Sequence, residues 1–109
     1  MTPAQAALLA LARDLFAPLG EITHRPMMGG FVLYADGHLF ATVHGDTRLY
    51  LRAKGALAER LAAAGAEQLT WVRPSDGKVS RMGYWSLPEA ALDDPEAACG
   101  WAREALAQD

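Results

Sequence analysis

The chain has 109 residues, with 10 Lys and Arg against 13 Asp and Glu, a hydrophobic fraction of 51% and a single cysteine. This length predicts one domain over residues 1–109, and the hydrophobic fraction excludes a disordered chain. The net charge of −3 argues against a general nucleic-acid binder, and no apolar stretch approaches the roughly 20 residues of a membrane span.

An amphipathic helix is predicted over residues 3–19. Thr2 and Pro3 open a capping-box pattern with proline at the first helical position, and apolar residues then recur at helical spacing. Pro18 and Gly20 predict its end, because proline interrupts the hydrogen-bond ladder and glycine suits a helix cap. The first residues hold no basic segment, so we expect no signal peptide.

Three short strands are predicted between Phe31 and Arg52, where apolar and polar residues alternate. Asp36-Gly37 and Gly45-Asp46 are typical of tight hairpin turns, so we expect an antiparallel meander. Leu39 is predicted on its inner face. The opposite face of the sheet is expected to carry Phe40, Arg48, Tyr50 and Arg52.

A short helix is predicted over residues 56–64, followed by a strand pair around residues 69–73 and 79–85 and a final helix that Asp94 caps. With helices at the N-terminus, in the middle and at the C-terminus on one face of an antiparallel sheet, the chain is predicted to be an α+β two-layer sandwich. A sheet face that is half apolar and half basic is unusual against water alone, so we expect a partner to cover it.

Side chains that could support catalysis or metal binding are sparse. His38 and His44 lie on one predicted strand, roughly 20 Å apart, so they cannot bind one metal ion together. Cys99 has no basic neighbour before Arg103 and is interpreted as a small buried thiol. Nucleophile-elbow and phosphate-loop motifs are absent from the sequence. We therefore expect no metal, no cofactor and no enzymatic activity.

The most unusual stretch runs from His24 to Gly30 and contains Arg25, two methionines and two adjacent glycines. The simpler interpretation is a strand end and a bend, in which the methionines fill gaps in the core. Alternatively, His24 and Arg25 lie beside the bare amides of Gly29 and Gly30 and receive an anion or a partner's backbone.

A second mixed cluster contains Arg81, Met82, Tyr84 and Trp85. Alternating aromatic and basic residues on a strand can stack nucleic-acid bases. Tyr84 and Trp85 are adjacent, however, so they point to opposite faces of a strand and at least one of them belongs to the core.

Several segments, taken in their order and spacing, form a family signature. They are Arg25-Pro26-Met27-Met28-Gly29-Gly30, Tyr34, Asp36-Gly37, Phe40-Ala41, Leu49-Tyr50-Leu51-Arg52, Met82-Gly83-Tyr84-Trp85, Leu87-Pro88-Glu89 and Trp101-Ala102. In this order they resemble the TfoX N-terminal domain, with Met28 in place of the usual Phe and Arg52 in place of the usual Lys. The resemblance implies a secretion-chaperone-like α+β fold, kinship to the TfoX/Sxy regulators of natural competence, transcription machinery as the partner, and no catalytic residues.

The leading hypothesis is a small cytoplasmic regulatory or adaptor domain that binds another protein or a second copy of itself. The cytoplasm is favoured because a lone cysteine cannot form an internal disulfide. Truncation of Tyr50 or Arg52 is expected to weaken binding without unfolding the chain. The expected binding residues are His24, Arg25, Gly29, Gly30, Arg48, Tyr50, Arg52 and Arg81.

Two other functions stay open. Residues 1–86 hold nine basic and seven acidic residues, whereas residues 87–109 hold one and six. A basic face could therefore bind nucleic acid, with Arg73 and Lys78 joining the basic residues already named. The bend at residues 25–30 could instead sense a small anion.

Overall fold

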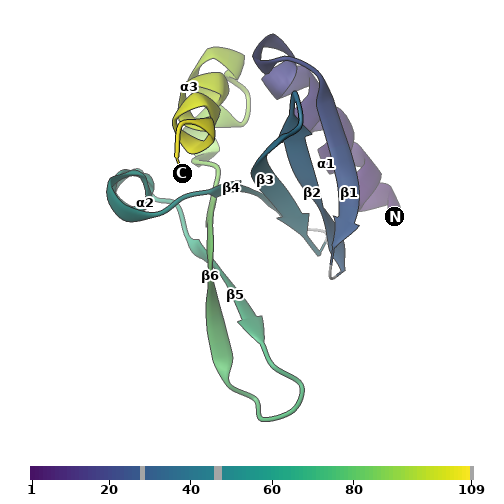
Figure 1. The fold of residues 1–109 in the computed structure, drawn as a ribbon, viewed down its shortest axis with the longest axis vertical. Helices are drawn as coiled ribbons and strands as arrows, with labels where there is room; N and C mark the ends of the chain where they lie inside the picture. The colour runs from purple at the N-terminus through teal and green to yellow at the C-terminus, as the bar shows by residue number, and fades with distance from the viewer. Residues whose placement is uncertain (28, 46–47, 109) are drawn as a thin grey trace.

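The computed structural model describes residues 1–27, 29–45 and 48–108 (Figure 1). The described residues form three α-helices and one six-stranded antiparallel sheet with the strand order β1-β2-β3-β4-β6-β5, which confirms the α+β class. In chain order the elements are α1 (Pro3–Phe16), η1 (Ala17–Leu19), β1 (Ile22–Met27), β2 (Gly30–Ala35), β3 (His38–His44), β4 (Arg48–Arg52), α2 (Gly55–Ala63), β5 (Gln68–Val72), β6 (Val79–Ser86), η2 (Glu89–Ala91) and α3 (Pro95–Leu106).

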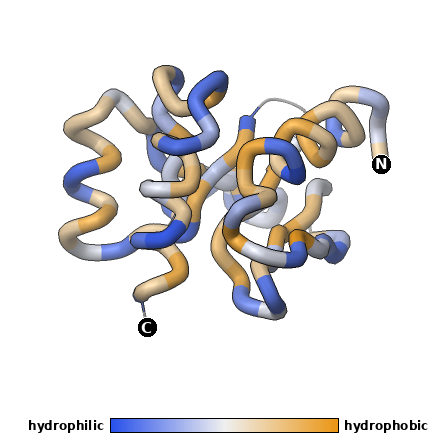
Figure 2. The backbone as a smooth tube through the Cα atoms, turned by 90° about the horizontal axis from the view of Figure 1, so that it is seen from above, coloured by the Kyte–Doolittle hydropathy of each residue, from blue (hydrophilic) through white to orange (hydrophobic). Residues whose placement is uncertain are grey.

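The helices share one hydrophobic core with a single face of the sheet. Phe16 of α1 packs edge-on against Phe40 of β3, with ring centroids 5.0 Å apart, and Leu61 of α2 and Ala102 of α3 belong to the same core. Figure 2 shows α1 and α2 at opposite ends of the molecule with hydrophobic segments between them. Burying a large apolar side chain contributes about 1.5–3 kcal/mol, so this layer supplies much of the folding free energy. In the described segments, no helix is both long and apolar enough to span a membrane.

Gln5 attaches the start of α1 to the sheet. Its backbone N–H donates to the Thr2 hydroxyl at 3.1 Å, and its side-chain oxygen accepts from the Thr2 backbone at 3.2 Å, which confirms the predicted capping box. The side-chain amide of Gln5 also donates to the carbonyl oxygens of Gly29 and Gly45, at 2.9 and 3.1 Å. One buried side chain therefore fixes the helix against the ends of two hairpins.

The β2–β3 pair contains an extra residue, and this corrects the predicted faces of β3. Leu33 pairs with Ala41, but Tyr34 pairs with Leu39, so Phe40 has no cross-strand partner on β2. Such a bulge places two successive side chains on one face of the sheet. Phe40 is fully buried in the core and Leu39 turns to the other face, so both predictions for these residues were wrong.

The sequence pattern also missed β1. This strand pairs antiparallel with β2, from Ile22 opposite Ala35 to Met27 opposite Gly30. The predicted hairpin of β5 and β6 is confirmed, and its far half extends away from the rest of the molecule as a two-stranded ribbon (Figure 1). The predicted turn at residues 45–46 and the packing of the methionine at residue 28 fall partly or wholly outside the described residues.

Gly30 is required by the close approach of β3 to β2. A Cβ atom at this position would lie 1.8 Å from the carbonyl oxygen of Val43, a contact that no side chain rotation can relieve. The paired strands would have to separate to admit it.

We expect Gly30→Ala to lower the free energy of unfolding by about 3 kcal/mol, the upper range for overpacked core positions. Gly83→Ala is the matched control, because a Cβ there meets no atom within 4 Å. Urea unfolding of the two variants beside the wild type measures the difference. Equal stability of the two variants would contradict this account of Gly30.

Candidate functional site

The sheet face that points away from the helices, the outer face, carries a second set of buried side chains. Within the described residues, the buried hydrophobic side chains outside the main core are Val32, Tyr50 and Leu69, which retain 6, 8 and 4% exposure. Alternation along the strands places them there, since Val32 and Tyr50 each lie between two core residues.

Half-buried aromatic and sulfur-containing side chains share this face of the sheet. Tyr34, Trp71, Met82 and Tyr84 are partly exposed, and none of them packs against the main core. With the three buried residues they form the outer cluster. Its members are Val32, Tyr34, Tyr50, Leu69, Trp71, Met82 and Tyr84.

Two arginines contact the outer cluster. The Arg25 guanidinium lies over the Tyr34 ring, 5.7 Å from its centroid, which is within cation–π range. Arg52 is the cross-strand partner of Tyr84. Burial raises the pKa of the Tyr84 hydroxyl, while the positive charge of Arg52 opposes this rise and Tyr34 adds to it. Tyr84 therefore stays protonated at neutral pH and can donate a hydrogen bond.

The structure separates His24 from Arg25. They are successive residues of β1, so Arg25 lies on the outer face and His24 on the helix side, where its ring packs edge-on against Phe31 at 5.7 Å. His24 lines an open cleft of about 520 Å³ between the start of α1 and the β1–β2 hairpin. The two side chains do not converge on one anion.

Gly29 and Gly30 are explained by the fold. Gly29 has a φ of 81°, and its carbonyl oxygen accepts hydrogen bonds from Gln5 and from the Gly45 backbone. Gly30 is the close-approach position described above. The simpler interpretation of this stretch, a strand end and bend, accounts for both residues.

Arg48 and Arg81 lie apart from the outer cluster. Arg48 forms an ion pair with Glu67 at 3.3 Å, on the rim of a cleft of about 410 Å³ that Leu8 and Leu11 of α1 also line. Arg81 is exposed on β6, opposite Thr70 of β5. Of the predicted binding residues, the structure therefore brings together Arg25, Tyr50 and Arg52.

Sequence reasoning missed Tyr34, Leu69 and Trp71 as members of this surface. Tyr34 was detectable, because it alternates with the core residues of β2, but Leu69 and Trp71 reach the outer face only through the pairing of β5 with β6. The prediction that Tyr84 and Trp85 face opposite sides is confirmed, since Trp85 packs against the main core.

The remaining candidates for chemistry are buried or scattered. Cys99 is buried as predicted, its thiol contacts the carbonyl oxygen of Leu15 at 3.0 Å, and burial raises its pKa against the opposing charge of Arg103. A raised thiol pKa disfavours the nucleophilic thiolate. Across residues 1–27, 29–45 and 48–108, no three His, Cys, Asp or Glu side chains gather as metal ligands.

The sequence matches the family model of the TfoX N-terminal domain over residues 14–109, nearly the whole chain. The chain belongs to the TfoX N-terminal domain family. A search of curated proteins finds no match to it.

Several residues that carry the signature of this TfoX N-terminal domain serve the fold. Gly30 admits the backbone of β3, and Phe40 is the bulged residue that fills the core. Asp36 and Gly37 both have positive φ, 48° and 84°, as the predicted tight turn requires. The signature therefore identifies the scaffold, whereas the outer cluster lies partly outside it.

Tyr50→Ala is expected to lower the free energy of unfolding by about 3 kcal/mol or more, as for other large-to-small changes of buried aromatic residues. This revises the expectation that its truncation would leave the fold intact. Tyr34→Ala, at a half-buried position of the same face, is the matched comparison and should cost less. Thermal or urea unfolding measures both, and an equal cost for the two variants would contradict the assignment.

Tyr84 gives the domain a predictable loss of stability at high pH. Because its folded-state pKa lies above the ordinary value of 10.0, the unfolded chain loses this proton first as the pH rises. The stabilisation is complete below that value and is lost as the pH passes through the folded-state pKa. Urea unfolding from about pH 8 to about pH 11 should show a smaller loss for Tyr84→Phe than for the wild type. Identical losses would contradict the assignment.

Proposed function

We propose that this TfoX N-terminal domain is a non-enzymatic regulatory or adaptor module of the cytoplasm, and that it binds another protein through the outer face of its sheet. The observation that carries the proposal is the composition of that face. It presents half-buried Tyr34, Trp71, Met82 and Tyr84, bordered by two arginines, in place of the uniformly polar surface that water alone would favour.

These residue types are the ones that protein interfaces favour. Tyrosine, tryptophan, methionine and arginine are enriched at interface centres, and tryptophan, tyrosine and arginine dominate the positions where truncation costs most affinity. Their half-buried state also limits the side-chain entropy that binding removes. The face spans six strands, which suits an interface of about 800 Å² per partner.

Kinship to the TfoX/Sxy regulators of natural competence supports a component of the transcription machinery as the partner. A direct nucleic-acid contact gains less support from the structure. Arg73, at the end of the ribbon, forms an ion pair with Asp76 at 2.9 Å, and Arg48 is paired with Glu67. Both pairs reduce the positive charge available to phosphates.

Affinity capture of the tagged chain from the lysate of its own host, with nuclease treatment and mass spectrometry, tests the proposal. We expect a stoichiometric protein partner that survives the nuclease. Arg25→Glu reverses one of the two positive charges that border the outer face and should weaken this binding at least tenfold, equivalent to about 1.4 kcal/mol.

Arg13→Glu is the matched control, because it makes the same change of charge on an exposed residue of α1, on the helix side of the molecule. It should capture the partner as the wild type does. Loss of every partner on nuclease treatment would indicate that the domain binds nucleic acid instead of a protein. Equal binding by Arg25→Glu and Arg13→Glu would show that the outer face is not the binding surface.

A further inference from the structure

The two edges of the sheet differ in how well they can accept another strand. The edge strands are β1 and β5, and an exposed edge with unpaired backbone groups is a template for pairing with a second chain. The β5 residues, Gln68–Val72, include no charged residue and no proline. Val72 is 57% exposed, as is its cross-strand neighbour Val79 at 61%.

Backbone hydrogen bonds at both ends of β5 show which groups face outward. The Glu67 carbonyl accepts from the Ser86 backbone, and the Arg73 backbone donates to Lys78, each at 2.9 Å. Residues of an antiparallel edge strand alternate between bonding their neighbour and pointing away from it. The register of β5 on β6 shifts between Gln68 and Thr70, but the hydrogen bonds at the two ends of β5 give the same alternation. Gln68, Thr70 and Val72 therefore present their N–H and C=O groups to the free edge.

The β1 edge is blocked by comparison. The Asp36 backbone donates to the Glu21 carbonyl, so the same alternation turns Ile22, His24 and Pro26 outward. Pro26 has no N–H to offer, and proline at such a position is one of the ways in which natural sheets protect an edge. One receptive edge remains on the sheet.

We propose that the β5 edge is an interaction surface for a second copy of this chain, which pairs with it antiparallel about a two-fold axis at Thr70. The outward groups of Gln68, Thr70 and Val72 then bond those of Val72, Thr70 and Gln68 in the second copy. The two sheets become one continuous sheet across the molecules.

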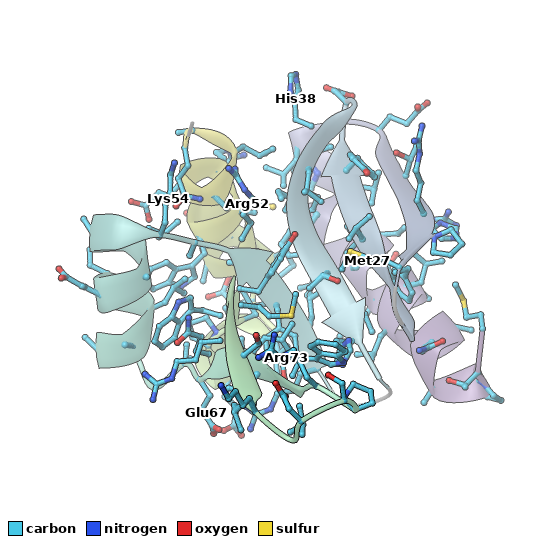
Figure 3. All side chains as sticks on the ribbon, turned by 60° about the horizontal axis from the view of Figure 1, so that its bottom comes forward. Met27, His38, Arg52, Lys54, Glu67 and Arg73 are labelled. Carbon is cyan, nitrogen blue, oxygen red and sulfur yellow. The ribbon has the colours of Figure 1, made fainter. Side chains whose placement is uncertain are left out.

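Charge complementarity at the ends of β5 favours this occupant and this register. Glu67 and Arg73, both labelled in Figure 3, lie three residues before and after Thr70. Their side chains are 71 and 45% exposed, and each forms an ion pair within its own chain, with Arg48 and Asp76, that the contact between the copies would share or replace. Pairing centred on Thr70 places Glu67 of each copy opposite Arg73 of the other. Opposite charges in directly facing positions stabilise a strand pair, whereas like charges destabilise it.

The pairing also joins the two outer faces. Leu69 and Trp71 alternate with the outward-bonding residues, so each Trp71 would face Leu69 of the other copy. The dimer uses the edge of β5 and not Arg25 or Tyr34, so it goes beyond the protein-binding function proposed above and is tested separately from it.

Analytical ultracentrifugation of the purified full chain tests the dimer. The wild type should reach twice its 11.7 kDa mass as the concentration rises through the micromolar range. Thr70→Pro removes one outward N–H and no bond to β6, so it should remain a monomer with the β-sheet circular dichroism of the wild type. Thr70→Ala keeps the N–H and should still dimerise.

Charge reversal tests the register and does not depend on how the proline variant folds. Each of the variants Glu67→Arg and Arg73→Glu places like charges opposite one another in its own homodimer. The dissociation constant of each homodimer should therefore rise at least tenfold. An equimolar mixture of the two restores both opposite-charge contacts and should recover the wild-type association.

Dimerisation of wild type and Thr70→Ala, loss in Thr70→Pro, and recovery in the mixture together support the proposal. A wild type that stays monomeric at the highest concentration overturns it, as does a dimer that survives Thr70→Pro. A mixture that associates no better than its components overturns the Thr70 register. Whether the outer face captures another protein does not affect these outcomes, because the dimer is measured on the purified chain.

Discussion

The bulge at Phe40 decides which side chains the start of β3 directs to each face of the sheet. With one extra residue in β3, Phe40 and Ala41 both point to the helices, and Leu39 joins Tyr34 on the outer face. The edge-on contact of Phe40 with Phe16 then joins the sheet to α1, and such pairs contribute about 0.5–1.5 kcal/mol beyond the burial itself. The irregularity thus supplies the core with Phe40 and places Leu39 opposite Tyr34 of the outer cluster.

Local chemistry predicted much of this fold. The capping box of Thr2 and Gln5 and the Asp36-Gly37 turn formed as expected, because each depends on residues a few positions apart. The bulge at Phe40 could not be predicted this way, since it is a property of how two strands pair. The strand β1 was not predicted because Pro26 and its polar neighbours interrupt the alternation of apolar and polar residues. It is held in the sheet by pairing with β2.

The candidate surface also combines features that local sequence predicts with features that depend on strand pairing. Strand alternation correctly placed Tyr50 and Arg52 on the face away from the helices, but it did not predict that Tyr50 is buried there. His24 and Arg25 looked like one site only while the stretch was interpreted as a bend. Once β1 is a strand, alternation sends them to opposite faces. Of the glycines beside them, Gly29 supplies a positive φ and Gly30 admits the backbone of β3, so both serve the fold.

Pro26 has a consequence for assembly. A sheet with two receptive edges could add copies at both ends and grow into a filament, because each addition would leave a new edge of the same kind. Here the strand at one end cannot donate a hydrogen bond at Pro26, near its C-terminal end, so a pair formed at the other end exposes only edges that carry this proline. In the dimer proposed above, a single imino acid therefore stops self-association at two copies.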